Sequence, residues 1–288
     1  MRERYQRIKA LATQHPVRML CRALAVNPSG YYAWRLRPAS QRSRTDQQLT
    51  ELLREEHLQS RKTYGRPRLL VRLRRLGHCH GHTRIARLMR AARINARPRR
   101  GFRPLTTQSN HQSPIAPNLL TGHSGSTASD QIWLTDLTYV QTAEGWLYVS
   151  CIIDHYSRRV VGWAFGDTLD TDLPLKALNM ALLQRRPGKG LVHHSDRGCQ
   201  YASSCYRQAL CRYGVNPSMS RAGNCYDNAA MESFWSTLKQ ELIYRQTFLT
   251  RAQASAAIFD YIETFYNPVR LHSALNYKSP VDFEHQNN

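Results

Sequence analysis

Three carboxylates stand in local contexts that set them apart from the other acidic residues of the chain. Asp136 occurs in Trp-x-x-Asp-x-Thr-Tyr, Asp196 in His-Ser-Asp-Arg-Gly and Glu232 in Asn-Ala-x-x-Glu-Ser-Phe. Three carboxylates at one point repel one another unless a cation is present, and hard oxygen ligands suit Mg²⁺ or Mn²⁺. Two such ions can activate the attacking oxygen and stabilise the leaving oxygen of an in-line phosphoryl transfer. We therefore expect a two-ion metal site whose ligands are Asp136, Asp196 and Glu232.

The elements around these residues must bring them together. Apolar patterns predict three neighbouring strands in an antiparallel meander, at 131–140, 146–154 and 158–165. A helix at 172–185, a strand at 191–194, a helix at 203–213, a strand at 215–219 and a long helix at 229–244 are predicted to follow. This is the order of an α/β RNase H-like fold, in which the first and fourth strands are neighbours. Asp136 and Asp196 can therefore converge, and the last helix can carry Glu232 to the same point. Asp154, Asp167, Asp170 and Asp172 are interpreted as turn or cap residues.

The first hundred residues read as all-α. Helical spacing covers 17–24, 29–34, 45–53, 66–76 and 83–94, which indicates two helix-turn-helix units. We expect Ser29 and Thr83 to cap helices, and Thr45 with Gln48 to form a capping box. On the last of these helices arginines recur every three residues opposite an apolar face, as a helix that reads the major groove requires; they are Arg84, Arg87, Arg90 and Arg93.

Charge favours a polyanionic partner. The chain has 41 basic and 20 acidic residues, and 26 of the basic but only 5 of the acidic ones lie in residues 1–104, so this segment carries the whole net charge of +21. Neutralising phosphates with Lys and Arg releases counterions, which makes double-stranded DNA the expected partner rather than a merely soluble basic surface. We also assign DNA contacts to Arg97, Arg99, Arg100 and Arg197.

Composition suggests four segments. We predict a helix-turn-helix at 1–44, a second, basic one at 45–100, a linker at 101–128, and a catalytic domain with a C-terminal helical extension at 129–288. No apolar run suits a membrane helix or a secretory signal, so we expect a cytoplasmic protein with no membrane partner. Seven cysteines without a Cys-x-x-Cys pair indicate neither a disulfide framework nor a cysteine zinc site. The cluster of His78, Cys79, His80 and His82 fits a solvated loop better than a metal site.

Several segments resemble a known family, and together they cover nearly the whole chain. They include YGRPRLLVRLRRLG, IWLTDLTYV, WLYVSCIIDHYSRRVVGWA, HHSDRGCQY, SMSRAGNCYDNAAMESFWSTLKQEL and FYNPVRLHSALNYKSPVDFE. The sequence is similar to the integrase-like (DDE) transposases of bacterial insertion sequences, specifically the downstream-frame (OrfB-type) protein of insertion sequence family three.

The resemblance implies that Asp136, Asp196 and Glu232 are the acidic triad of that family. It also implies a catalytic role for Lys239, two turns after Glu232 on the same helix face. The expected activity is cleavage of the element's terminal repeats and joining to target DNA. Joining two ends requires a homo-oligomer in a synaptic complex, and the family pattern implies an upstream-frame partner protein or a fusion with it.

Two other functions are compatible with parts of the sequence. A DNA-binding repressor without catalysis would explain the basic segment, but it has no use for three clustered acids. A ribonuclease of the same fold would explain the acids, but two helix-turn-helix units favour duplex DNA over RNA–DNA hybrids.

Overall fold

The computed structural model describes residues 1–38, 40–96, 114–121, 125–221 and 228–287. The chain divides into two compact units: Met1–Glu56 with Gly81–Ile94, and His57–His80 with Asn95–Asn288. The segment predicted as a second helix-turn-helix therefore contributes residues to both units. Within the described residues, no helix is long and apolar enough to span a membrane.

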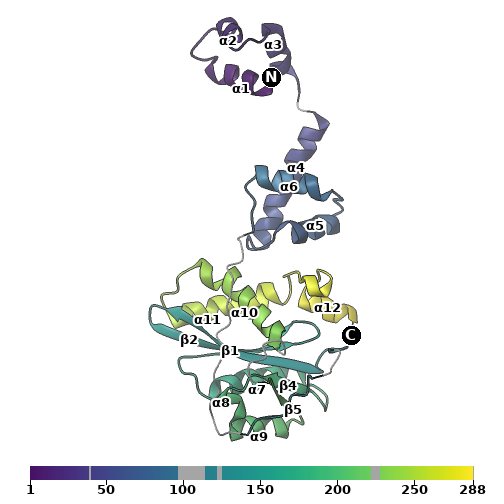
Figure 1. The fold of residues 1–288 in the computed structure, drawn as a ribbon, viewed down its shortest axis with the longest axis vertical. Coiled ribbons are helices and arrows are strands. Elements are labelled where there is room, and N and C mark those ends of the chain that lie inside the picture. The colour runs from purple at the N-terminus through teal and green to yellow at the C-terminus, as the bar shows by residue number, and fades with distance from the viewer. Residues whose placement is uncertain (39, 97–113, 122–124, 222–227, 288) are drawn as a thin grey trace. The chain divides into compact units, whose positions relative to one another are not determined.

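The first unit is helical. Its N-terminal part contains α1 (Arg2–Leu11), α2 (Val17–Ala23) and α3 (Pro28–Leu36), shown in purple in Figure 1. They enclose a small core that includes Ile8 and Tyr31. The sequence does not predict α1, because Ile8 is the one side chain that this helix buries and a single apolar residue gives no periodicity.

Two predicted helix starts in this unit are wrong. α3 begins at Pro28, where the Asn27 side chain accepts a hydrogen bond of 3.0 Å from the backbone N–H of Ser29, so Asn27 and not Ser29 is the cap. α4 (Gln41–Gln59) already includes Thr45, whose hydroxyl donates to the Gln41 carbonyl at 2.9 Å. Short hydroxyl side chains bond the backbone inside a helix as well as at its start, so their presence alone does not fix the boundary.

The arginine-bearing helix is also shorter than predicted. α6 runs His82–Ala91 after Gly81, so Thr83 lies inside it and makes no cap. Its buried side chains, Ile85, Leu88 and Met89, form one face, as the spacing indicated. Arg93 follows the helix end in the left-handed backbone region, with φ of 56°.

The second unit is built on one five-stranded sheet. Its strands are β1 (Ile132–Thr142), β2 (Gly145–Asp154), β3 (Val160–Gly166), β4 (Val192–Ser195) and β5 (Asn216–Met219). The order is β3-β2-β1-β4-β5. β1, β2 and β3 are antiparallel neighbours, whereas β4 is parallel to both β1 and β5. The predicted meander and the pairing of the first with the fourth strand are both confirmed.

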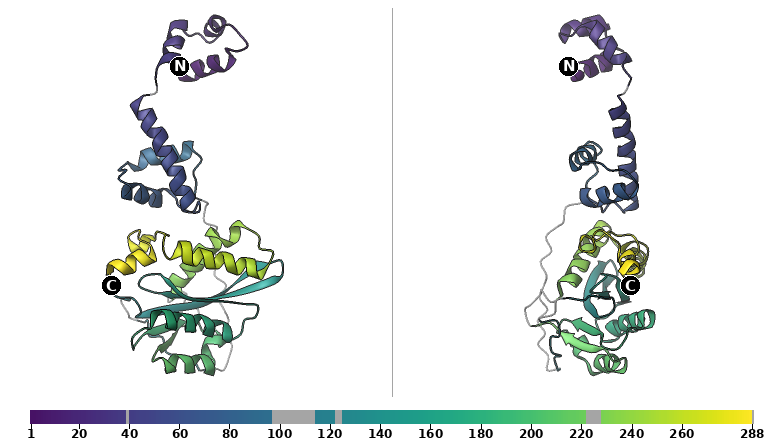
Figure 2. Two further views of the ribbon diagram at one scale, coloured as in Figure 1. Left: turned by 180° about the vertical axis from the view of Figure 1, so that it is seen from behind. Right: turned by 90° about the vertical axis from the view of Figure 1, so that its right-hand side faces the viewer.

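Helices cover both faces of this sheet. α7 (Asp172–Arg185), α8 (Cys199–Ala202) and α9 (Ser204–Arg212) lie on one face, and α10 (Ala229–Glu241) and α11 (Arg251–Asp260) lie on the other (Figures 1 and 2). The core between the sheet and the first set includes Trp133, Leu178 and Tyr206. α7 approaches β3 so closely that a Cβ on Gly162 would lie 2.3 Å from the Ala177 carbonyl oxygen, which explains the glycine.

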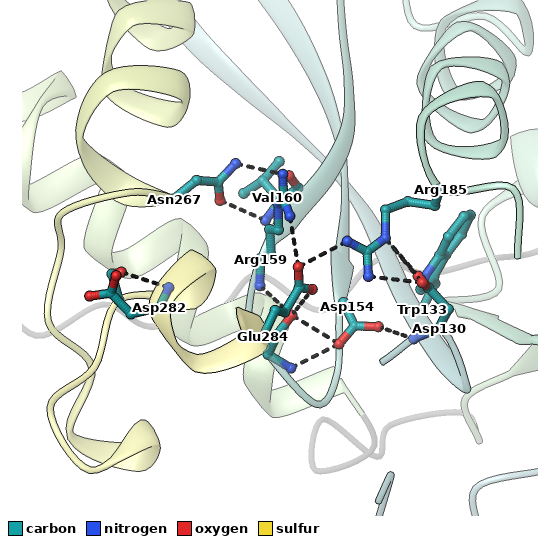
Figure 3. A network of polar contacts seen from close by, with 11 residues as sticks. Asp130, Trp133, Asp154, Arg159, Val160, Arg185, Asn267, Asp282 and Glu284 are labelled. Carbon is teal, nitrogen blue, oxygen red and sulfur yellow. Dashed lines mark hydrogen bonds and ion pairs between the residues drawn. The ribbon is translucent and has the colours of Figure 1, made fainter. Parts of the chain in front are cut away.

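The chain continues into a C-terminal extension of η3 (Tyr261–Tyr266), η4 (Ser273–Leu275) and α12 (Pro280–Asn287). Figure 3 shows how polar contacts fix it to the sheet. Glu284 of α12 accepts hydrogen bonds from Arg159 at 2.7 Å and Arg185 at 2.9 Å. The Asn267 side chain accepts from the Val160 N–H at 2.9 Å and donates to the Val160 carbonyl at 3.0 Å.

α5 (Arg66–Arg75) and the residues before it lie against the same extension. The Tyr64 hydroxyl donates to the Val269 carbonyl at 3.1 Å and accepts from the Leu271 N–H at 2.7 Å. Arg68 donates to the Leu271 carbonyl at 2.8 Å, and Arg75 donates to the Tyr277 carbonyl at 2.8 Å. These two arginines of the basic segment therefore have structural bonds within the second unit.

Candidate active site

Adjacent parallel strands bring two of the predicted metal ligands to one edge of the sheet. Leu134 of β1 pairs with His194 of β4. Asp136 and Asp196 each follow two residues later, so they stand at the same level. Side chains alternate along a strand, and Trp133 belongs to the core on the α7 face. The Asp136 side chain therefore faces α10.

The two aspartates repel each other electrostatically. Burial, followed by the neighbouring Asp196 carboxylate, raises the pKa of Asp136 to about 7. Two hydrogen bonds lower the pKa of Asp136, but by less than burial and Asp196 raise it. The Leu137 N–H donates to Oδ1 at 2.8 Å, and the Trp235 indole N–H donates to Oδ2 at 3.0 Å. A partly buried carboxyl that is hard to ionise beside a second carboxylate has too little positive charge around it. The two aspartates therefore fit a hard divalent cation.

Glu232 is not brought into contact with the two aspartates. It lies in the first turn of α10 and is partly exposed, and burial raises its pKa. Among the residues that the structure describes, no group of three His, Cys, Asp or Glu side chains is arranged to hold a metal. Glu232 nevertheless shares a helix face with Trp235 and Lys239, three and seven residues further on, and both of these act on Asp136.

Lys239 is placed beside the aspartates by α10. Its ammonium lies 5.7 Å from the centre of the Tyr139 ring, and its charge lowers the pKa of Asp136. Burial in turn lowers the pKa of Lys239 itself. The spacing of seven residues after Glu232 thus does put this lysine on the face that looks toward Asp136.

Trp235 is a site residue that the sequence alone did not reveal. Trp133 and Trp235 are both buried, as tryptophans of the core are. The Trp235 indole, however, also holds one oxygen of Asp136. Its place one turn after Glu232 was the available signal, because side chains three apart on a helix share a face.

The surroundings of Asp196 are tightly built. The Gly198 N–H donates to Asp196 Oδ1 at 2.9 Å, and a Cβ on Gly198 would lie 3.0 Å from that oxygen. Arg197 donates through Nε to the Ser220 carbonyl at 2.8 Å, and the buried His194 forms a hydrogen bond of 2.9 Å with the Ser218 hydroxyl. Both side chains thus help to join β4 to the strand beside it, and DNA contact by Arg197 stays a prediction.

Three of the other predicted DNA contacts, Arg84, Arg87 and Arg90, lie on α6. Arg84 donates through Nε to Asp46 at 2.8 Å, and Arg87 pairs with the other oxygen of the same carboxylate. Hydrogen bonds from Arg87 and then Arg84 lower the pKa of Asp46. Arg90 and Arg93 are exposed. Arg97, Arg99 and Arg100 lie outside the described residues, and no DNA contact is tested by the structure.

Comparison with known proteins identifies the domains. Residues 126–225 and 213–280 match family models described as "Integrase core domain", and residues 44–102 match an "HTH-like domain". The chain is 46% identical to "Insertion element IS600 uncharacterized 31 kDa protein" of Shigella sonnei, over 92% of this chain and 97% of that protein. It is 36% identical to "Transposase InsF for insertion sequence IS3A" of Escherichia coli (strain K12), over 99% of both chains.

Solved structures also resemble the chain. An integrase chain in the simian T-cell lymphotropic virus intasome with the PP2A regulatory subunit B56 gamma covers 82% of this chain and 74% of its own length, at 14% identity and a TM-score of 0.47. The HTLV-2 integrase catalytic core domain in complex with magnesium covers 56% and 99%, at 15% identity and a TM-score of 0.42.

A helical HTH-like region followed by an integrase core of RNase H-like topology defines a polynucleotidyl transferase, the class of enzyme to which integrases and transposases belong. Within that class, the extent of the match to InsF shows the family. The chain belongs to the transposases of the IS3 family of bacterial insertion sequences.

Proposed function

We propose that this transposase binds the ends of its insertion sequence and performs both strand cleavage and strand transfer at a DDE triad of Asp136, Asp196 and Glu232. The observation that carries the proposal is the pairing of β1 with β4 two residues before Asp136 and Asp196, at a point where partial burial and the nearby Asp196 raise the pKa of Asp136 to about 7. In the first step water attacks a phosphodiester at the element end and leaves a 3′-hydroxyl. In the second step that hydroxyl attacks a phosphodiester of the target, which joins the element end to the target's 5′-phosphate and releases the target's 3′-oxygen as the leaving group.

The triad residues would hold Mg²⁺ or Mn²⁺, two ions in all, which supply Lewis acidity to the phosphoryl transfer. Other residues of the chain orient this set. Trp235 and the Leu137 N–H each hold one oxygen of Asp136, which fixes the direction of the carboxylate. Lys239 places a positive charge beside Asp136, where it can meet a phosphate oxygen of the bound strand.

The test is to incubate the purified protein with labelled element ends and Mg²⁺ and to size the products. Asp136→Asn, Asp196→Asn and Glu232→Gln each remove a ligand charge with little change of shape, so each should abolish cleavage and joining while end binding stays nearly intact. Asp170→Asn, an exposed acid at the start of α7, is the matched control and should remain active. Strand transfer at the wild-type level by one of the three variants would remove that residue from the site.

A further inference from the structure

A pocket of about 360 Å³ lies on the face of α10 that points away from Asp136. From α10 it is lined by residues that include Ala230, Ser233 and Thr237, whereas Trp235 and Lys239 of the same helix act on Asp136. At 3.6 residues per turn these two sets lie on opposite sides of the helix. The pocket therefore lies across α10 from Trp235 and Lys239, and on the sheet side it is lined by Leu134 of β1, two residues before Asp136.

Basic side chains converge on this pocket. Its walls include Arg68, Arg158 and Arg270 together with the imidazoles of His155 and His272. None of the described residues that line it is acidic. A cavity with this lining attracts an anion, and its volume falls in the range of roughly 300–1,000 Å³ that is usual for small-ligand sites.

Arg270 is already neutralised by a partner. The Glu241 carboxylate accepts from Arg270 at 2.7 Å through Nη2 and at 2.8 Å through Nε. This buried pair holds the pKa of Glu241 below its ordinary value, although burial alone would raise it. Arg270 thus lines the pocket but is already paired with Glu241, so a different guanidinium must bind an anion there.

Arg158 is that group. Its Nη1 atom is buried and has no hydrogen-bond partner among the described residues. Asp154 is near enough to act on its charge, but the Asp154 oxygens already accept from the N–H groups of Asp130 at 2.7 Å and Ser157 at 2.8 Å. A buried guanidinium N–H without an acceptor costs free energy that a bound oxyanion would recover.

The two imidazoles add polar groups to the pocket without adding charge. Burial, and then Arg158, lower the pKa of His155 to about 4. Burial, followed by Arg270, Arg68 and Arg158, lowers the pKa of His272 well below its ordinary value. Both rings are therefore neutral at neutral pH, and the charge offered to a ligand is that of the guanidinium groups.

We propose that this pocket, built around Arg158, binds a phosphate group, either of a DNA strand that passes α10 or of a free phosphate anion. Phosphate oxygens are the acceptors that a planar guanidinium fork binds best. With a DNA strand as the source, the inference rests on the function proposed above. With free phosphate as the source, it stands independently of that function.

The test measures orthophosphate binding by calorimetry on the full chain, at constant ionic strength. Arg158→Met keeps the length of the side chain but removes the guanidinium, and it should weaken binding at least about tenfold, because a hydrogen bond to a charged group is lost. Arg212→Met, an exposed arginine of α9, is the matched control and should bind as the wild type does. An Arg158→Met protein that binds phosphate like the control, or a wild type that binds none, overturns the proposal.

Thermal unfolding without phosphate separates binding from a structural role. If the Arg158 Nη1 group serves to bind a ligand, Arg158→Met should unfold at the wild-type temperature or above it, because a buried N–H group without an acceptor has been removed. If the methionine variant does not fold, the test uses Arg158→Lys, which keeps the positive charge but loses the planar guanidinium. Weaker phosphate binding by this variant supports the site, and unchanged affinity overturns it.

A competition experiment identifies the source of the phosphate. A short single-stranded oligonucleotide that displaces the Arg158-dependent orthophosphate supports a DNA strand, and undisturbed binding supports the free anion; in both cases the pocket is a phosphate site. DNA-end cleavage is assayed in parallel. Failure of the phosphate proposal leaves cleavage by the wild type intact, whereas failure of the proposed function leaves Arg158-dependent binding intact without any cleavage.

Discussion

The Asp136 carboxyl is held by two donors that come from different parts of the chain. The Leu137 N–H belongs to its own strand, and the Trp235 indole N–H comes from α10. The second bond ties the direction of the carboxylate to the position of the helix that also carries Glu232 and Lys239. Trp235 is thus a positioning residue for the acidic site.

Loss of the indole N–H should therefore slow catalysis more than it harms folding. Trp235→Phe keeps an aromatic ring in the buried site but removes the bond to Asp136, and we expect cleavage to fall roughly tenfold or more, as for other partners of metal-ligating carboxylates. Cleavage rates at saturating DNA are measured beside end-binding affinity. Trp133→Phe is the control, because this equally buried indole bonds Asp130 instead. Equal losses of cleavage in the two variants would show that only packing matters.

The placement of Asp136 and Asp196 at one edge of the sheet could be predicted, whereas the donors that hold Asp136 could not. Asp136 and Asp196 are recognisable because each lies in a distinctive strand context that the topology then brings together. Trp235 looks like any apolar helix residue, since its donor role depends on a contact across 99 residues of sequence. Asp46 likewise gave no sign of pairing with Arg84 and Arg87.

At the scale of elements, the Asp46 carboxylate links α4 to α6. Arg84 and Arg87, which we expected to contact DNA, both form salt bridges with this one acid. Their side chains can bind phosphates only if they leave Asp46 or share it. The salt bridge therefore competes with DNA for Arg84 and Arg87.

Asp46→Asn should consequently strengthen DNA binding. The change removes a negative charge from the predicted DNA face and releases both guanidinium groups, so affinity for duplex DNA should rise and should depend more steeply on salt. Anisotropy titrations of the full chain at several salt concentrations measure both quantities, with Glu51→Gln, another exposed acid of α4, as the control. Weaker binding would mean that the pair holds the two helices in the geometry that DNA requires.

α12 is attached to the sheet by a buried carboxylate. Glu284 is bonded by Arg159, Arg185 and Ser157, and these hydrogen bonds hold its pKa below the ordinary value against the effect of burial. A group whose pKa is lower in the folded state stabilises the protein above its unfolded pKa of about 4.3. That contribution is lost as the pH falls through the lower, folded value.

Glu284→Gln should therefore destabilise the protein at neutral pH, by about 3 kcal/mol, because the buried Glu284 charge is lost from its pairs with Arg159 and Arg185, and of the two arginines only Arg185 keeps another salt bridge among the described residues, to Asp130. Below about pH 4 the difference from the wild type should begin to shrink, because the unfolded wild-type chain then binds a proton at Glu284, and it should vanish only below the lower, folded pKa. Denaturant unfolding at several pH values measures this dependence. A difference in stability that stays constant with pH would show that the charge of Glu284 is not the stabilising feature.

Most elements of the catalytic unit could be predicted because their apolar residues recur at the spacing of a strand or a helix. The five strands and α7 were found within a few residues of their observed bounds. The less predictable features, α1 and the starts of α3, α4 and α6, depend on single side chains that bond the backbone in several ways. The attachment of α5 to the C-terminal extension was also beyond reach, because its bonds join residues some 200 positions apart.

At the scale of the whole molecule, the charge is divided along the chain. The first 104 residues carry the entire net positive charge, while the rest, which includes the catalytic unit, is neutral overall. A fragment of residues 1–104 was the natural choice for a binding assay on sequence grounds. Since His57–His80 belongs to the second unit, the full chain is the sounder choice.

The upstream-frame partner stays a prediction, which is checked by comparing excision in cells with and without the upstream protein or the fused product.

Joining two ends of an element makes a prediction about assembly. Each end needs an acidic site, so we expect a homo-oligomer in which two protomers each act on one end. When wild-type protein is mixed equally with Asp136→Asn at constant total concentration, paired-end joining should fall to about a quarter of the wild-type level, the fraction of pairs with two active members. Replacing the inactive variant by Asp170→Asn should leave joining unchanged, because that exposed acid lies outside the site. Joining that falls only to about half would mean that a single active protomer serves both ends, and the proposed division of work between protomers would then be wrong.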